Sequence, residues 1–239
     1  MTNRPFKSNL ALQIMLIWLT ATWIITAINP LYPRDWLIEN LLVFIIAALL
    51  IGSYHRFAFS NLSYGLFTVF LSLHLVGAHY TYSEVPIGFW FQSLFELDRN
   101  HYDRLVHFCF GLLIAYPFRE VLLRRARIKP AYSYFIAVCV IMAFSSFYEV
   151  LEGAVAMVVS PELGMAYLGT QGDVWDAQKD SFLAFVGVVI AMLLSWWRDP
   201  EPINTKKHKN PQMHALKCRS TLNERMLGPK GGAQDVRNK

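Results

Sequence analysis

Three aspartates with helical spacing mark the stretch whose residue types could do chemistry. Asp173, Asp176 and Asp180 stand at positions i, i+3 and i+7, so on a helix their carboxylates share one face. Three like charges on one face repel one another, and a bound cation would relieve that repulsion. Two simpler interpretations compete with a cation site. The aspartates could form a solvated helix start, where acidic side chains are favoured, or they could pair with Arg104 or Lys179.

Two further pairs of ionisable residues have the spacing of one helix face. Asp103 and His107 are four residues apart, and Glu149 and Glu152 are three apart. Carboxylates with an imidazole suit zinc, manganese or iron, whereas oxygen ligands alone suit magnesium or calcium. Asp103 and His107 could equally share a structural hydrogen bond, and the two glutamates could be a solvated interfacial pair. The sequence contains no HExxH, glycine-rich phosphate loop or GxSxG motif that would indicate a particular enzymatic reaction.

The composition is that of a membrane protein. Hydrophobic residues make up 54% of the 239 residues and charged residues 16%, against roughly 25% charged in a typical soluble domain. The net charge of +5 belongs to the C-terminal tail, because residues 200–239 carry nine Lys or Arg and three Asp or Glu. Such a tail is typical of a cytoplasmic segment near a membrane, and no nucleic-acid partner is expected. The three cysteines include no CxxC pair and predict no disulfide framework.

Six apolar segments are long enough to cross a bilayer, which needs about 20 residues per helix. They are residues 10–28, 36–54, 62–80, 104–123, 132–151 and 181–197, and the helix of the fifth has room to continue to residue 159 before Pro161 ends it. The predicted fold class is therefore all-α, a polytopic membrane bundle of six transmembrane helices within residues 1–200. Residues 201–239 show no apolar periodicity and are predicted to be a basic, disordered cytoplasmic tail.

The distribution of basic residues predicts the orientation of the bundle. With the N-terminus in the cytoplasm, twelve Lys or Arg residues near the spans lie inside and four lie outside. Cytoplasmic loops carry the excess of Lys and Arg, so both termini are predicted to be cytoplasmic. The four outer residues are Arg34, Arg99, Arg104 and Lys179.

This topology brings the ionisable residues to the outer edge of the membrane. The fourth span begins there, the fifth ends there, and the sixth begins there again, at about 1.5 Å of rise per residue. The predicted layer consists of His79, Asp103, His107, Glu149, Glu152, Asp173, Asp176 and Asp180. With Arg104 and Lys179 as the only nearby basic partners, all of these except His79 are predicted to be ligands of a divalent metal ion.

Three functions fit such a layer. The first is an integral-membrane enzyme that uses the metal on a lipid or cell-envelope substrate. The second is a transporter of a cation or proton, and the third is a structural or interaction protein without catalysis. A transporter usually places charges and broken helices near the middle of the membrane, whereas here the charges gather at one edge. The sequence favours a binding or catalytic site over a transport path, and it leaves open whether the protein is an enzyme.

Three motifs together resemble the YjdF-like family of bacterial inner-membrane proteins. They are Asp103-Arg-Leu-Val-His107, Phe147-Tyr-Glu-Val-Leu-Glu152 and Gly169-Thr-Gln-Gly-Asp-Val-Trp-Asp-Ala-Gln-Lys-Asp180. The resemblance covers residues 1 to about 200. It implies a multi-pass protein of the bacterial inner membrane. Because the family is a domain of unknown function, it assigns no catalytic residue here.

Overall fold

Every secondary-structure element in the described part of the chain is helical. The computed structural model describes residues 6–159 and 161–198, so the predicted tail of residues 201–239 lies outside the described residues. The elements are a short 3-10 helix η1 (Phe6–Ser8), the long helices α1 (Leu10–Thr26), α2 (Pro33–Ser53), α3 (Asn61–Tyr80), α5 (Tyr102–Arg124), α6 (Pro130–Val158) and α8 (Asp176–Arg198), and the short helices α4 (Pro86–Leu94) and α7 (Pro161–Leu168).

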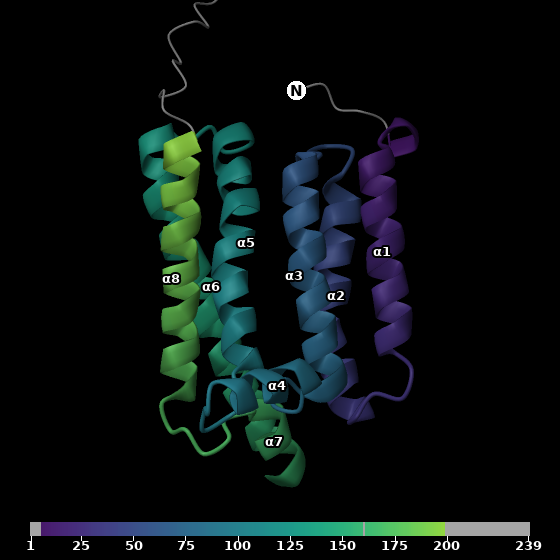
Figure 1. The fold of residues 1–239 in the computed structure, drawn as a ribbon. Helices are drawn as coiled ribbons and strands as arrows, with labels where there is room; N and C mark the ends of the chain where they lie inside the picture. The colour runs from purple at the N-terminus through teal and green to yellow at the C-terminus, as the bar shows by residue number, and fades with distance from the viewer. Residues whose placement is uncertain (1–5, 160, 199–239) are drawn as a thin grey trace, which may run out of the picture. The chain divides into compact units, whose positions relative to one another are not determined.

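The long helices alternate in direction and form two groups of three. Helix α3 packs against both α1 and α2, helices α5, α6 and α8 pack against one another, and α3 joins α5 to connect the groups. Figure 1 shows α4 and α7 at one end of the bundle, opposite the end where α1 begins and α8 finishes. We call these the α4/α7 end and the η1 end. Successive long helices therefore cross the bundle in opposite directions.

Five of the described helices are long and apolar enough to cross a membrane: α2, α3, α5, α6 and α8. The first predicted span, residues 10–28, is shorter than expected, because α1 is an apolar helix of 17 residues that ends at Thr26. The chain leaves the helix there, since Asn29 has a φ of 50° and Pro30 follows it in the sequence.

Most of the other helices begin before or end after their predicted spans, and this matters for the site. Helix α8 begins at Asp176 rather than residue 181, so Asp176 and Asp180 both belong to its first turns. Helix α6 continues to Val158, which places Glu149 and Glu152 well inside a helix. The apolar segment alone underestimates α8 because Asp176 and Asp180, the acidic residues near its start, are buried among their neighbours and continue the helix. The connection between α3 and α5 contains the short helix α4.

Two glycines allow α5 and α8 to approach closely. A Cβ atom on Gly111 would collide with the carbonyl oxygen of Ala184, and one on Gly187 would collide with the carbonyl oxygen of Phe108. Lipid chains are as apolar as the side chains, so helices in a membrane associate through such close packing, for which small residues are required. Gly111 and Gly187 thus fix the spacing of the two helices that carry most of the candidate site.

We expect Gly111→Ala to lower the stability of the purified protein. The added methyl group meets backbone on α8, which cannot move aside as a side chain can, and overpacking of this kind costs about 1–3 kcal/mol. The measurement is the melting temperature in detergent. Gly52→Ala is the matched control, because a Cβ on Gly52 has no other atom within 4 Å. Equal melting temperatures for the two variants would contradict the close contact.

Candidate metal centre

Helices α5 and α8 bring three potential metal ligands together at the α4/α7 end. Asp103 and His107 come from α5 and Asp180 from α8, and one ligand atom of each lies within 4.8 Å of the others. All three side chains are buried, with exposed fractions of 7%, 7% and 2% respectively. The close packing of α5 on α8 therefore joins residues that are more than 70 positions apart in the sequence.

Helix α6 adds a further carboxylate beside His107. The Nε2 atom of His107 lies 3.4 Å from Glu149 Oε1 and 3.6 Å from Asp103 Oδ1. Glu149 Oε1 and Asp180 Oδ1 are buried and have no hydrogen-bond partner among the described residues. A buried carboxylate oxygen without a donor is costly, so these two atoms mark a place where a cation or proton would be stabilised.

Arginines neutralise two of the predicted ligands. Asp176 receives a hydrogen bond from Arg99 Nη1 at 2.5 Å and from Arg104 Nη2 at 3.1 Å. Asp173 Oδ2 accepts hydrogen bonds from Arg104 Nη2 at 2.5 Å and from Lys179 Nζ at 2.6 Å. The hydrogen bond from Lys179 holds the pKa of the Asp173 carboxyl well below its usual range. These two aspartates therefore already have cationic partners.

The expectation that Arg104 and Lys179 are the only nearby basic partners is wrong, because Arg99 is also there. Arg99 is 7% exposed, and besides Asp176 it donates to the carbonyl oxygens of Gly169 and Thr170 at 3.0 and 2.8 Å. The sequence placed Arg99 on the same side of the membrane as the acids. It gave no sign of the pairing, since Arg99 and Asp176 are 77 residues apart.

The Gly169–Asp180 motif is also held by an amide pair. The backbone N–H of Asn100 donates to Gln171 Oε1 at 3.0 Å, and Gln171 Nε2 donates to the carbonyl oxygen of Asn100 at 2.9 Å. Gly169 and Gly172 have φ angles of 58° and 87°, which glycine adopts without strain. Much of this motif thus serves to hold the start of α8 against the start of α5, which sets Asp180 beside Asp103.

A second buried network, which the sequence did not reveal, adjoins the site. Tyr148 donates its hydroxyl to Glu39 Oε2 at 2.8 Å, and His74 Nε2 lies 3.1 Å from the carbonyl oxygen of Glu39. Burial raises the pKa of Tyr82 well above its ordinary value, so its hydroxyl keeps the proton and donates to His74 Nδ1 at 2.6 Å. His74 Nε2 then carries the ring proton. The Tyr148 ring lies 6.1 Å from that of His107, which joins the two groups.

Of the two remaining residues of the predicted layer, one lies next to the cluster and the other does not. Glu152 is 7% exposed and lies one turn beyond Glu149 on α6, next to the cluster. His79 does not join the cluster, because its Nδ1 atom lies 2.9 Å from the carbonyl oxygen of Thr26 and connects α3 to the end of α1. The position of His79 at the end of a span was correct, but the face on which it lies could not be read from the span boundaries.

Comparison with known proteins identifies relatives of this chain. Residues 11–200 match the model of a family described as predicted membrane protein DUF2238. The chain is also similar to inner membrane protein YjdF of Escherichia coli K12. The two are 36% identical over 188 residues, which is 77% of this chain and 88% of that protein. No solved structure matches the chain at a significant level.

Proposed function

This chain belongs to the DUF2238 family and is a multi-pass protein of the bacterial inner membrane, and on that premise we propose that it holds a divalent metal ion at its α4/α7 end. Asp103, His107 and Asp180 are the proposed ligands, and Glu149 is the fourth. A divalent metal held by these residues would polarise a carbonyl or phosphoryl oxygen of a lipid or cell-envelope substrate, or activate a bound water molecule.

The observation that carries this proposal is the excess of buried negative charge. Asp103, Glu149 and Asp180 lie around the imidazole of His107, and Glu152 is buried one turn from Glu149 on α6. In the described part of the chain none of these four carboxylates forms an ion pair with Lys or Arg. Carboxylates that are buried close together cannot all ionise without a compensating cation. A site of carboxylates plus one imidazole suits zinc, manganese or iron better than magnesium or calcium.

Asp173 and Asp176 take a different role in this proposal from the one their spacing predicted. Their arginine and lysine partners make a metal ion unnecessary for them. We assign them the task of positioning α8, so that Asp180 meets Asp103 and His107. The buried Arg99–Asp176 pair then sets the geometry of the ligands without touching the metal.

Two buried apolar clusters inside the bundle support a site over a transport path. Leu71 is fully buried in the cluster of α3 and its neighbours, and Ile141 and Val188 are fully buried in a second cluster of α5, α6 and α8. The acidic cluster lies at the α4/α7 end, whereas an ion path requires polar groups at depth. Analysis of the metal content of the purified full-length protein, measured beside Asp103→Asn, tests the proposal.

We further propose that all six long helices cross the membrane with both termini in the cytoplasm. Helix α1 has 17 residues, which is at the lower limit of about 17 for a spanning helix. In this arrangement the α4/α7 end faces the periplasm, residues 1–200 form the membrane domain, and residues 201–239 form a separate cytoplasmic tail.

Reporter fusions should show this topology directly. Fusions of green fluorescent protein after Arg56 and after Arg127 should fluoresce, because both points follow helices that end on the cytoplasmic side, where the basic residues are concentrated. Alkaline phosphatase fused after Glu96, in the segment between α3 and α5, should be active. An active phosphatase after Arg127 would contradict the orientation.

A further inference from the structure

We propose that the metal centre receives its substrate sideways from the bilayer, through a groove between α2 and α6 that binds one acyl chain of a membrane phospholipid. The metal chemistry at the α4/α7 end of this groove rests on the proposed function, whereas binding of the chain does not. The substrate is then an amphiphile whose hydrocarbon part stays in the membrane while its polar part reaches His107.

The groove is apolar and opens toward lipid. It has a volume of about 520 Å³, with Ile45 and Leu49 of α2 on one side, Phe147 of α6 on the other, and Phe110 and Ile114 of α5 at the bottom. The residues at its rim face outward, with exposed fractions of 58% for Ile45, 66% for Leu49 and 57% for Phe147. In a bilayer the material beside this rim is hydrocarbon chain, not water.

The groove has the length that an acyl chain needs. Along α5 its lining extends from Asp103 to Phe118, a rise of about 22 Å at 1.5 Å per residue. One leaflet provides about 15 Å, half of the ~30 Å hydrocarbon thickness. An extended chain that entered from the leaflet at the α4/α7 end would therefore fit along the groove.

One end of the groove coincides with the candidate site. His74, Tyr82, Asp103, His107 and Tyr148 all contribute to the lining there, mainly through their carbon atoms. These residues belong to the metal centre and to the Glu39 network, so the groove ends between the two. An apolar channel that ends at buried carboxylates and imidazoles is complementary to a molecule with a hydrocarbon chain and a polar head.

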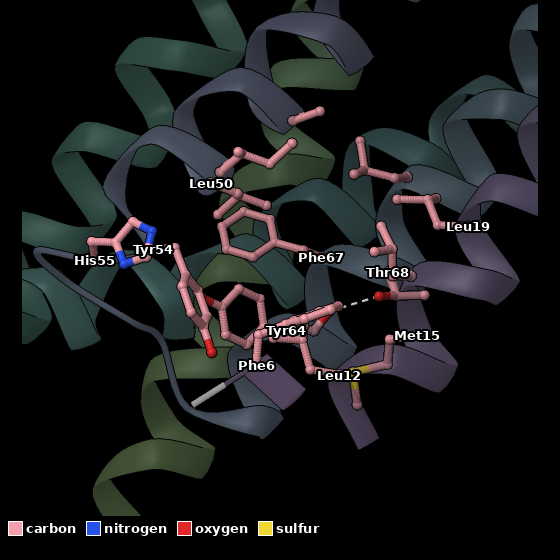
Figure 2. A pocket seen from close by; sticks show the side chains of 14 residues that line it. Phe6, Leu12, Met15, Leu19, Leu50, Tyr54, His55, Tyr64, Phe67 and Thr68 are labelled. Carbon is pink, nitrogen blue, oxygen red and sulfur yellow. Dashed lines mark hydrogen bonds between the residues drawn. The ribbon is translucent and has the colours of Figure 1, made fainter. Parts of the chain in front are cut away.

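A second apolar cavity provides a comparison. Figure 2 shows this cavity of about 590 Å³ between α1, α2 and α3, where Leu12, Met15 and Leu50 lie around it and His55 stands at its edge. It lies toward the η1 end, away from the metal centre, and no Asp or Glu is part of its described lining. A chain bound there would have no route for its polar head to the cluster.

Photolabelling of the full-length protein tests the groove. The protein is reconstituted in vesicles of phosphatidylethanolamine and phosphatidylglycerol that carry a diazirine on one acyl chain, irradiated, and mapped by mass spectrometry. We expect label on Phe110 and Ile114, which surrounding lipid reaches poorly. Leu49→Trp at the rim should reduce that label about tenfold, as a loss of ~1.4 kcal/mol in binding would. Leu193→Trp on the exposed face of α8 should leave it unchanged.

The outcomes separate this inference from the proposed function. Groove labelling without Mn²⁺ binding would contradict the proposed metal centre and would still support the proposed lipid groove. Mn²⁺ binding with labels spread equally over the exposed residues of α8 and the groove, or concentrated in the cavity of Figure 2, would overturn the groove. Leu49→Trp should keep its Mn²⁺, because Leu49 is not a proposed ligand. Asp180→Asn, which removes a ligand that is not part of the groove lining, should keep its groove label.

Discussion

Asp103→Asn should abolish metal binding by the purified protein. Asparagine keeps the size of the side chain but removes one of the charges that face His107 and Asp180. Loss of an outer-shell partner alone weakens metal binding by about 10–100-fold, so loss of a ligand should weaken it by at least about 100-fold. The measurements are metal content after purification and titration with Mn²⁺ followed by electron paramagnetic resonance.

Asp173→Asn is the matched control for this experiment. Asp173 belongs to the same sequence motif as Asp180, yet it is bonded to Arg104 and Lys179, so the metal should remain. Retention by Asp103→Asn together with loss by Asp173→Asn would contradict the assignment of ligands.

The stability of the metal-free protein gives an independent check on Asp103. Without metal, Asp103→Asn relieves the repulsion between buried carboxylates, and the variant should melt at or above the temperature of the metal-free wild type. Saturating metal should raise the melting temperature of the wild type, since a ligand at 100 times its Kd adds about 2.7 kcal/mol. The same metal should leave Asp103→Asn unchanged. A variant that merely misfolds would melt lower in both conditions.

Arg99→Ala should destabilise the protein strongly. Arg99 and Asp176 are buried together, with exposed fractions of 7% and 5% for their side chains. Removing one partner of a buried ion pair leaves an uncompensated charge and costs about 3–5 kcal/mol. For a chain of this size that corresponds to a fall of roughly 10 °C in melting temperature. Thermal unfolding in detergent measures it.

The double variant Arg99→Ala/Asp176→Ala separates charge from packing. Without the orphaned carboxylate, this variant should recover part of the lost stability, because the penalty of an unpaired buried charge is gone. It should still bind metal more weakly than the wild type if the pair positions α8, as proposed. A single variant as stable as the wild type would show that Arg104 alone satisfies Asp176.

The membrane character of the chain was readable from sequence because the bilayer imposes a simple requirement. A spanning helix needs about 20 apolar residues, and such runs appear in composition without any knowledge of packing. Five long helices agree with predicted spans, and the family motifs were recognised from short segments confirmed by the match over residues 11–200. The helix ends were less accurate, since polar residues such as Asp176 continue a helix when partners bury them.

The sequence by itself determined which residues could bind a metal ion and at which end of the helices they lie. Periodicity placed Asp103 with His107 and Glu149 with Glu152, because residues on one helix face follow from spacing alone. Only the tertiary structure decided which acids have partners. Asp176 meets Arg99, 77 residues away, while Asp180, one turn further along the same helix face, meets Asp103 and His107. Spacing determines which residues share a helix face. Which residues of other helices lie opposite that face depends on how helices distant in sequence pack together.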